Sequence, residues 1–287
     1  MSKVWVITGC SSGFGREIAL AAARRGDSVV ATARNVSKIE DLKHLGLKIV
    51  TKRLDVLDDQ ATMDATMADV IKEFGRIDVL VNNVGYYQEG VIEELDMDEV
   101  KQSFDINVIG QLTVLRSVLP YMRAQRSGTI AHLGSVAGWA GNMTAGIYCG
   151  AKAAIALISE SLHNELAPMG IDVTCIDPGF FRTNFLEPGH RIPAKNRIAD
   201  YEQITGPMSA FFQQRSKNQD GDPVKGAELI VQVLTKSGVC AGRKIPPRLA
   251  LGRDAVGVIG GALDKNRKIL DDWAPIISTT DCDDVKA

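Results

Sequence analysis

The sequence predicts an α/β protein in which helices cover both faces of a doubly wound, parallel sheet. Strand-like and helical segments alternate through about residue 180, as in repeated right-handed strand–helix–strand units. The strand-like segments are continuous apolar runs, a pattern typical of parallel strands buried on both faces. A glycine-rich turn also joins the first strand-like run to the first helical segment.

The elements follow one another in a regular order. The run KVWVITG precedes a helical REIALAAARRG, and the later strand-like runs are SVVATA, LKIVTKRLDV, IDVLVNNVG, GTIAHLGS and DVTCIDPG. Further helices are predicted near residues 59–74, 98–123, 148–167, 224–237 and 254–272. No internal repeat divides this series, so we expect a single domain over residues 1–287.

Two segments depart from the alternation. Residues 184–223 are rich in proline, glycine and charge, with short helical pieces. Such a segment is either a disordered excursion or a lid, and we expect a variable substrate lid inserted late in the domain. Residues 275–287 are polar and are expected to form a loose C-terminal tail.

Composition excludes several classes of protein. The chain of 287 residues is 45% hydrophobic and 24% charged, with a formal net charge of −2. This near-neutral balance argues against nucleic acid or an anionic membrane as a partner, and no apolar stretch reaches the roughly 18 residues of a membrane span. Five scattered cysteines without metal-like pairing predict reduced thiols, no metal site and a cytoplasmic location.

The first strand-like run ends in a glycine-rich turn with phosphate-binding character. Gly9, Gly13 and Gly15 occur in the spacing T-G-x-x-x-G-x-G, between a strand and a helix. Glycines there let backbone N–H groups approach an anion at the helix N-terminus. We therefore expect a dinucleotide phosphate on this turn, held also by its remaining residues Ser11, Ser12 and Phe14.

The end of the second strand predicts which dinucleotide binds. An NAD-preferring protein carries an acidic residue about 20 residues beyond the glycines, but Ala33 stands there and Arg34 follows. A planar, permanently charged guanidinium suits a 2′-phosphate. The sequence therefore favours NADP(H), although a solvent-facing arginine at a strand end is the alternative.

The segment YCGAK places Tyr148 and Lys152 four residues apart, which on a helix brings both to one face. A neighbouring ammonium favours phenolate, so we expect Lys152 to lower the pKa of Tyr148. That would make Tyr148 a general acid or base near neutral pH. An ordinary surface helix is the alternative for this spacing alone.

Several motifs in order resemble the short-chain dehydrogenase/reductase family, in its NADP-preferring, hydroxysteroid-dehydrogenase-like ketoreductase branch. They are TGCSSGFG at 8–15, LDV at 54–56, NNVG at 82–85, FDINVIG at 104–110, GS at 134–135, YCGAK at 148–152 and DPGFFRT at 177–183. The resemblance implies a Rossmann fold and a nicotinamide cofactor. Two departures are Val84, where the family has alanine, and Ser12, where some NADP-preferring members carry a basic residue.

The resemblance also implies roles for single residues around the cofactor. Asp55 and the Val56 backbone are expected at the adenine, and Asn83 with Gly85 against the cofactor. Phe181 and Thr183 resemble the segment that closes over the nicotinamide carboxamide.

The same resemblance implies a catalytic tetrad. Ser135 is expected to orient the substrate oxygen, Tyr148 to exchange its proton, and Lys152 to hold the nicotinamide ribose. Asn107 is expected to anchor a water that links Lys152 to solvent. As isolated residues, Ser135 and Asn107 have a plainer alternative as capping side chains.

The expected substrate is a hydrophobic carbonyl compound or alcohol. Its pocket walls are predicted to be apolar and partly aromatic, with ordinary core packing as the alternative for each residue. The predicted wall residues are Tyr87, Trp139, Met143, Phe180 and Phe185. The sequence thus predicts an NADP(H)-dependent oxidoreductase that runs in the reductive direction. Alternatives are a biosynthetic enzyme with non-redox chemistry and a non-catalytic NADP-sensing protein.

A homodimer or homotetramer is also expected by the same resemblance. Family members usually pair through two long helices, which here are the segments near 98–123 and 148–167.

Overall fold

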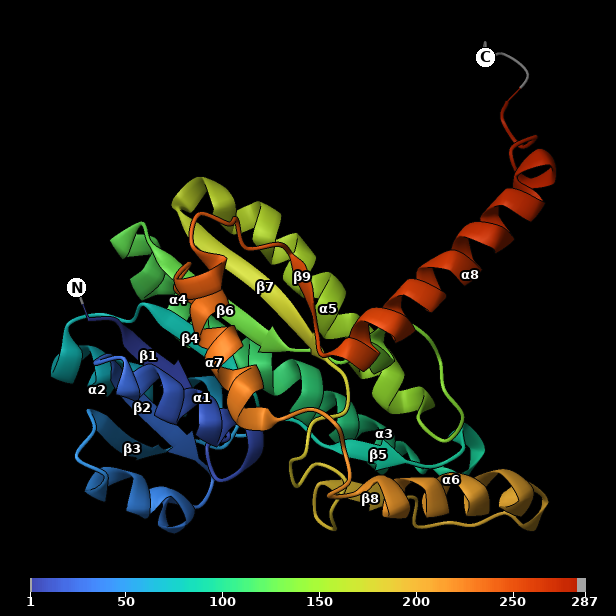
Figure 1. The fold of residues 1–287 in the computed structure, drawn as a ribbon, viewed down its shortest axis with the longest axis horizontal. Coiled ribbons are helices and arrows are strands. Elements are labelled where there is room, and N and C mark those ends of the chain that lie inside the picture. The colour runs from blue at the N-terminus through green and yellow to red at the C-terminus, as the bar shows by residue number, and fades with distance from the viewer. Residues whose placement is uncertain (1, 283–287) are drawn as a thin grey trace.

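The computed structural model describes residues 2–282 and contains the predicted parallel sheet (Figure 1). Its strands are β1 (Val4–Ile7), β2 (Ser28–Ala33), β3 (Ile49–Arg53), β4 (Val79–Asn82), β6 (Gly128–Leu133), β7 (Ile171–Pro178) and β9 (Arg248–Leu251). They form one seven-stranded sheet in the order β3-β2-β1-β4-β6-β7-β9, and every pair is parallel. From β1 the chain first adds strands on one side of the sheet and then, from β4 onward, on the other side. In such sheets a crevice forms at this switch point, at the carboxyl ends of the strands.

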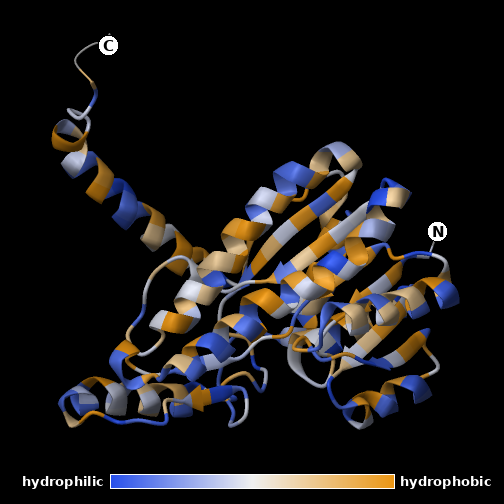
Figure 2. Ribbon diagram, turned by 180° about the vertical axis from the view of Figure 1, so that it is seen from behind, coloured by the Kyte–Doolittle hydropathy of each residue, from blue (hydrophilic) through white to orange (hydrophobic). Residues whose placement is uncertain are grey.

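Helices cover both faces of this sheet, which confirms the predicted doubly wound architecture. Helices α1 (Gly13–Arg24) and α7 (Pro223–Leu234) pack on one face, and α2 (Gln60–Phe74), α4 (Gly110–Gln125) and α5 (Gly146–Leu166) pack on the other. The sheet residues between these layers are almost fully buried, and Figure 2 shows them as hydrophobic bands along the strands.

The helix predicted near residues 98–123 is interrupted. Helix α3 (Met97–Phe104) passes into a π-helical turn at Asp105–Ile109 before α4 begins. The Asn107 side chain lies within this turn, where its Nδ2 donates to the Ser103 carbonyl at 2.9 Å and to the Tyr86 carbonyl at 3.2 Å. π-helical turns inside α-helices are frequent at functional sites, because they re-aim one side chain.

Residues 184–223 are ordered against the rest of the domain. Strand β8 (Arg191–Pro193) pairs with β5 (Tyr87–Glu89), and a helix of 14 residues, α6 (Glu202–Arg215), is longer than the short pieces predicted there. Arg191 and Glu89 form an ion pair of 3.3 Å in which both side chains are largely buried. This contact fixes the variable segment against the loop that follows β4.

Helix α8 (Arg253–Ile277) extends further than predicted. Residues 275–277 are helical, so the prediction of a loose tail from residue 275 is wrong there, and 283–287 lie outside the described residues. The reason is that an apolar pattern at helical spacing continues through Trp273, Ile276 and Ile277. Within residues 2–282, no helix combines the length and apolar character that crossing a membrane would need.

Short helices connect these elements. They are η1 (Val36–His44), η2 (Ile92–Glu94), η4 (Val136–Gly138), η5 (Ala167–Met169), η6 (Ala199–Tyr201) and η7 (Gly238–Cys240).

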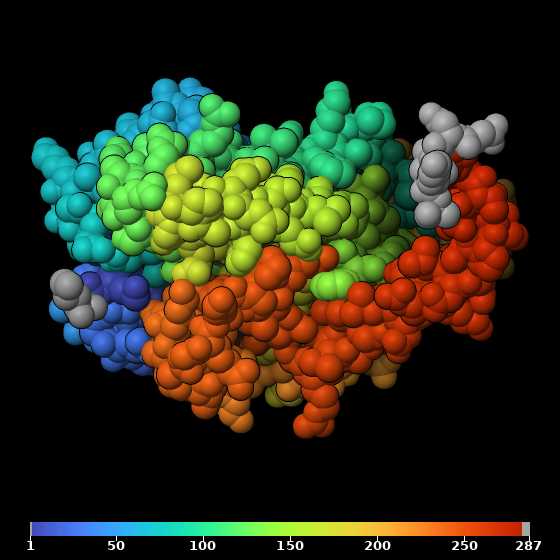
Figure 3. All heavy atoms as spheres, turned by 90° about the horizontal axis from the view of Figure 1, so that it is seen from above, coloured from blue at the N-terminus to red at the C-terminus, as the bar shows by residue number. Residues whose placement is uncertain are grey.

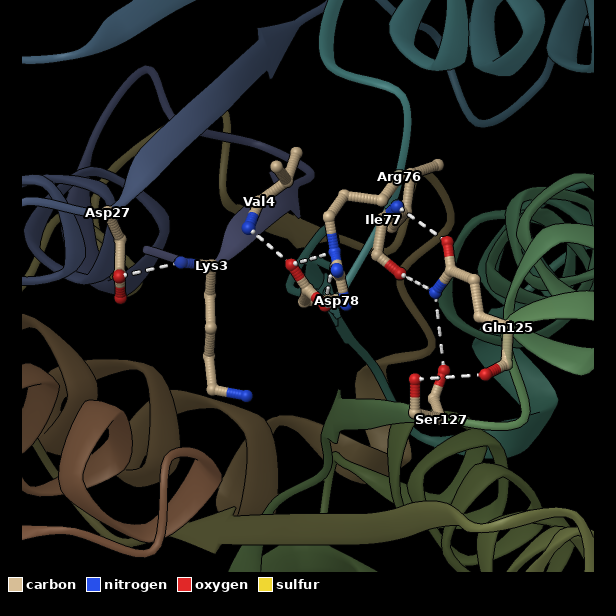
Figure 4. A network of polar contacts seen from close by, with 8 residues as sticks. All are labelled: Lys3, Val4, Asp27, Arg76, Ile77, Asp78, Gln125 and Ser127. Carbon is tan, nitrogen blue, oxygen red and sulfur yellow. Dashed lines mark hydrogen bonds and ion pairs between the residues drawn. The ribbon is translucent and has the colours of Figure 1, made fainter. Parts of the chain in front are cut away.

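A polar network holds the amino ends of the central strands, opposite the crevice (Figure 4). Asp78, which directly precedes β4, accepts the Val4 N–H at 2.8 Å and pairs with Arg76 at 2.6 Å. The Gln125 amide bonds both the N–H and the carbonyl of Ile77. These bonds satisfy backbone groups that strand pairing leaves open, and so fix β1, β4 and α4 relative to one another.

Candidate active site

A large cavity of about 640 Å³ lies at the carboxyl ends of the strands. It runs from the glycine-rich turn after β1, past the ends of β4 and β6, to helix α6. Most of the predicted cofactor and catalytic residues line it: Gly9, Ser11, Ser12, Gly13, Phe14, Arg34, Asp55, Val56, Asn83, Gly85, Ser135, Tyr148, Lys152, Phe181 and Thr183. The structure therefore brings together motifs that are up to about 170 residues apart in the sequence.

The glycine-rich turn has the backbone that its spacing predicts. Gly9 and Gly13 have positive φ angles of 72° and 58°, which favour glycine. Gly15 lies beneath the turn and not on the cavity wall, and a Cβ there would come within 2.4 Å of the Gly9 carbonyl oxygen. Asn83 braces the same turn, because its Nδ2 donates to the carbonyls of Thr8 at 2.9 Å and Gly9 at 3.2 Å.

The end of the cavity at which the sequence predicts the adenosine is bordered by Arg34, Asp55 and Val56. Arg34 is exposed and forms no ion pair with any other residue of the described range 2–282. The Asp55 carboxylate accepts the Leu57 N–H at 3.2 Å, which holds the loop after β3 in place. The guanidinium is thus free to meet an anionic group at this end of the cavity.

The middle of the cavity is closed by the segment after β7. The rings of Phe14 and Phe181 lie 4.8 Å apart at an angle of 60°. Thr183 approaches the turn at Gly13, where an added Cβ would lie 3.4 Å from the Thr183 Cβ. This contact brings the segment after Pro178 over the glycine-rich turn.

Ser135, Tyr148 and Lys152 lie together on the cavity wall, from the end of β6 and from α5. All three are buried, and the Lys152 Nζ lies 5.8 Å from the centre of the Tyr148 ring. The Lys152 ammonium donates to the Leu133 carbonyl at 2.7 Å. Asn107 flanks it across Gly85, where a Cβ would lie 2.7 Å from the Asn107 Oδ1 and 3.3 Å from the Lys152 Nζ.

Burial dominates the ionisation of this site. It raises the pKa of Tyr148 well above its ordinary value, while hydrogen bonding to the Ser135 side chain acts in the lowering direction. Burial lowers the pKa of Lys152 to about 8, opposed by the charges of Cys175 and Asp177. The predicted lowering of the Tyr148 pKa by Lys152 is therefore wrong: the pKa is raised, burial is the largest cause, and the lowering contribution comes from Ser135.

A buried carboxylate below the cavity holds the loop that carries Ser135. The Asp177 Oδ1 accepts the Ser135 N–H at 3.1 Å, and its Oδ2 accepts two guanidinium bonds from Arg248 at 2.8 and 3.0 Å. Trp139 donates its Nε1–H to the same oxygen at 2.8 Å, and Arg248 stacks on its ring at 3.7 Å. Trp139 is therefore part of this network and not of the cavity wall, which corrects its predicted place in the substrate pocket.

The comparisons with known proteins agree with this geometry. Residues 3–191, more than half of the chain, match the family described as short chain dehydrogenase. The chain belongs to that family. Its members are oxidoreductases that use NAD(H) or NADP(H).

Similar proteins span nearly the whole chain. Oxidoreductase BOA17 of Botryotinia fuckeliana is 34% identical over 267 residues, covering 92% of this chain and 94% of that protein. The uncharacterized oxidoreductase YusZ of Bacillus subtilis is 33% identical over 247 residues, covering 83% and 86%. A crystal structure of a short-chain dehydrogenase from Streptomyces avermitilis has a TM-score of 0.88 at 38% identity, covering 98% of this chain and 100% of that one.

In this short-chain dehydrogenase, the end of the cavity at which the sequence predicts the substrate is aromatic. Four of the predicted wall residues line the cavity, namely Tyr87, Met143, Phe180 and Phe185. The Tyr87 and Tyr148 rings pack edge-on with their centres 5.2 Å apart. The aromatic wall is therefore in direct contact with Tyr148, the predicted proton donor. The variable segment and α6 add further residues to this end that were not predicted from the sequence: Leu186, His190, Ile192, Met208, Phe211, Phe212 and Gln219.

One sequence signal points to the missed wall. The pair Phe211–Phe212 is an aromatic dipeptide directly before a polar stretch, and Phe212 packs at 5.2 Å against Tyr87. No metal-like cluster of His, Cys, Asp and Glu occurs among the residues that the structure describes.

Proposed function

We propose that this short-chain dehydrogenase is an NADP(H)-dependent reductase of hydrophobic ketones or aldehydes. The observation that carries the proposal is the placement of Ser135, Tyr148 and Lys152 on the wall of one cavity. The other end of that cavity is the glycine-rich turn with Arg34 beside it. An aromatic wall opposite the glycine-rich turn leaves room for the substrate next to the catalytic residues.

The preference for NADP(H) rests on charge at the adenosine end. Arg34 is the cation that lines this end of the cavity, and Ala33 before it offers no carboxylate to a ribose hydroxyl. A guanidinium attracts a phosphate monoester and can bind it through two hydrogen bonds, whereas an NAD-preferring site needs an acidic side chain here. The nicotinamide of the bound cofactor supplies the hydride, and this chain provides position and proton.

The reductive direction agrees with the ionisation of the site. A carbonyl oxygen gains negative charge as hydride arrives at its carbon, and this charge must be met by a proton. The raised pKa of Tyr148 keeps its hydroxyl protonated at neutral pH, so the proton donor is present before each turnover. Oxidation of an alcohol would instead require the phenolate, which burial disfavours.

The other three residues position and resupply this proton. The Ser135 hydroxyl lies beside Tyr148 and can donate to the same substrate oxygen. Lys152, whose ammonium donates to the Leu133 carbonyl, would hold the ribose of a bound cofactor, and Asn107 lies next to it across Gly85. This arrangement suits a chain of proton carriers that leads from Tyr148 through Lys152 toward Asn107.

The substrate class follows from the wall chemistry. Tyr87, Phe180, Phe185, Phe211 and Phe212 bring five aromatic rings to the substrate end, together with Met208. Such a lining favours a flat or polycyclic apolar skeleton over a small polar one. A non-catalytic NADP sensor is disfavoured, since it has no need of the complete tetrad.

Pairing of two chains through α4 and α5 is part of the same proposal. Ile109, just before α4, and Leu157 on α5 are 52% and 61% exposed on these helices. Covering them in a homodimer or homotetramer removes apolar surface from water. The cytoplasmic location stays a prediction.

The proposal is tested by following cofactor absorbance with the full-length protein. A panel pairs polycyclic and aryl ketones with small polar ketones, each with NADPH and with NADH. We expect turnover with the apolar members, and a kcat/KM at least about tenfold higher with NADPH, as one charge-assisted phosphate contact provides. Tight NADPH binding without turnover of any panel member would favour a non-catalytic NADP-sensing protein. Equal rates with NADPH and NADH would contradict the proposed preference for NADP(H).

A further inference from the structure

A series of aromatic rings leads from Tyr148 to the surface of the protein. The Tyr148 and Phe212 rings both pack against Tyr87, each with ring centres 5.2 Å apart. Phe212 in turn packs against Phe211 at 5.4 Å. The first three of these residues are buried, whereas Phe211 is 46% exposed, and all four line the cavity. The apolar wall therefore continues from the predicted proton donor to the outside of the protein.

The outer end of this wall is a rim of half-exposed apolar side chains from three elements. Beside Phe211 on α6, the rim contains Met143 in the loop before α5, which is 64% exposed, and Val258 on α8, which is 49% exposed. Each of the three also lines the cavity, so the cavity reaches the surface at these side chains. Single exposed apolar residues are common, but three from distant parts of the sequence on the wall of one cavity indicate a binding surface.

Helix α8 is held at the cavity by its first turns. The Asp254 carboxylate accepts the Phe180 N–H at 2.6 Å, which joins the start of α8 to the segment after β7. Ala255 and Ile259 are buried against the domain, and Val258 lies on the cavity wall. Further along, α8 forms an exposed ridge in the space-filling view from above (Figure 3). The base of α8 thus supplies an apolar side chain to the rim at a fixed position.

We propose that the substrate has an extended apolar chain, which leaves the cavity between α6 and α8 and lies against Met143, Phe211 and Val258. The inference rests on the proposed function, which places the reacting carbonyl at Tyr148. A compound that ends inside the cavity leaves the rim side chains in water, whereas a longer apolar chain covers them and is stabilised by burial. The substrate is therefore a long-chain apolar ketone or aldehyde and not a small one.

The arrangement of the rim favours a small molecule over a macromolecular surface. The rim side chains come from a loop and two helices, and the rings that continue inward from them are buried. A second chain or a membrane would cover the rim from outside but would not reach Tyr87 and Phe212. One elongated ligand contacts both the rim and the buried rings, as concave apolar sites allow.

The first test varies the length of the substrate. It measures kcat/KM with NADPH for methyl ketones that carry straight alkyl chains from butyl to decyl. Each methylene that moves from water onto the apolar wall is expected to raise kcat/KM roughly two- to fourfold, through the whole series. A rise that ends at the short members overturns the extended site and leaves the proposed reaction intact.

A binding measurement separates this proposal from the proposed reaction. The same ketones are titrated calorimetrically into the protein saturated with NADP⁺, which cannot reduce them. We expect the dissociation constant to fall with each added methylene, as kcat/KM rises. Affinity that grows with chain length without any turnover by NADPH would support the extended site and contradict the proposed reaction. Affinity that is independent of chain length would overturn the extended site.

Variants of α8 place the chain on the rim. Val258→Asp is expected to lower the ratio of kcat/KM for the decyl ketone to that for the butyl ketone about tenfold, because the chain then lies against a carboxylate. The matched control is Val256→Asp on the same helix, which changes a valine that is 65% exposed and does not line the cavity. Residues two apart on a helix face different ways, so the control should leave the ratio unchanged.

A variant on another element tests the rim as a whole. Met143→Gln, in the loop before α5, should lower the same ratio in the same direction as Val258→Asp. Equal ratios in Val258→Asp and Val256→Asp overturn the proposal. It is also overturned if Val258→Asp leaves the ratio unchanged but alters the molar mass of the chain in sedimentation equilibrium or its binding to phosphatidylcholine vesicles, since the rim then serves a second chain or a membrane.

Discussion

Asp177 accepts a hydrogen bond from the backbone N–H of Ser135 at 3.1 Å, and both residues are buried. This bond fixes the start of the loop that carries the Ser135 hydroxyl, for which we propose a contact with the substrate oxygen. Arg248 holds the other carboxylate oxygen at 2.8 Å, so the charge of Asp177 is balanced inside the protein. The position of the Ser135 side chain therefore depends on a residue that does not touch the substrate.

Substituting Asp177→Asn keeps an acceptor for Ser135 but leaves the Arg248 guanidinium without its partner. We expect kcat to fall about 10²-fold, because small displacements of a positioned group have effects of that size. The dissociation constant of NADPH should stay within about twofold, since the carboxylate does not line the cavity.

The matched control is Asp172→Asn on the same strand, where the carboxylate pairs with Lys236 near the surface at 2.7 Å. It should leave kcat unchanged. Equal losses of kcat in the two variants, or a loss confined to NADPH affinity, would argue against a positioning role for Asp177.

Substituting Gly15→Ala places a methyl group 2.4 Å from the Gly9 carbonyl oxygen and 2.5 Å from the Asn83 amide nitrogen. Because the Gly9 contact is with backbone, the turn itself must move. We expect NADPH affinity to fall at least about tenfold and the free energy of unfolding to fall by about 1–3 kcal/mol.

Gly206→Ala provides the control for this change. Gly206 lies within α6 at an ordinary backbone angle, with nothing within 4 Å of an added Cβ. Titration of cofactor fluorescence and urea unfolding compare the two variants. Unaltered NADPH affinity in Gly15→Ala would show that the turn does not shape the cofactor site.

Arg34→Asp should reverse the cofactor preference. The carboxylate repels a 2′-phosphate and can accept the ribose hydroxyls of NAD(H), so the ratio of kcat/KM for NADPH to that for NADH should fall about 10²-fold or more. The kcat with saturating NADPH should change little, as Arg34 is remote from Tyr148. The control is Arg243→Asp, which makes the same charge change at an exposed position. Arg182 is unsuitable as a control, because its guanidinium donates a hydrogen bond to the Gln219 carbonyl. A constant selectivity ratio would place the phosphate elsewhere.

Lys152→Met should stabilise the cofactor-free protein at pH 7 while it abolishes turnover. Burial lowers the pKa of Lys152 to about 8 from an ordinary 10.5, so the native state holds a proton less tightly than the unfolded state. We expect a gain of roughly 1–3 kcal/mol after the loss of the hydrogen bond to Leu133.

The stability gained by Lys152→Met is expected to depend on pH. Between pH of about 8 and 10.5 the unfolded wild-type chain binds more protons than the native one, so wild-type stability rises with pH there. The Lys152→Met variant lacks this rise. The difference in free energy of unfolding between the variant and the wild-type chain should therefore become smaller over the same pH range. Urea unfolding at pH 7, 9 and 10.5 measures it. A difference that is constant with pH would mean that Lys152 has no cost of burial.

The fold could be predicted because its signals are local. The apolar strand runs and the glycine-rich turn need no partner to be recognised, and their parallel order follows from chain topology. The interruption between α3 and α4 could not be predicted, because it depends on an Asn107 side chain that bonds the distant Tyr86 backbone. The continuity of α6 was hidden by Gly206 and Pro207 inside the helix.

In the candidate site, too, the local features could be predicted from the sequence and those that depend on tertiary contacts could not. Helical spacing correctly places Tyr148 and Lys152 on one cavity wall, but burial depends on tertiary packing, and burial decides the pKa of both. The position of Trp139 in a loop between Ser135 and Tyr148 predicts a place on the substrate wall. Its indole instead turns toward Asp177 on β7, a partner 38 residues later in the chain.

Tyr148→Phe tests the central claim that a buried, protonated phenol meets the developing alkoxide. The measurement is single-turnover oxidation of bound NADPH by an apolar ketone, together with the dissociation constant of NADPH. We expect the rate to fall by roughly 10²–10⁴-fold, as loss of a general acid does, with NADPH bound about as tightly as before. A rate within a few-fold of the wild-type rate would contradict the assignment of Tyr148 as the proton donor.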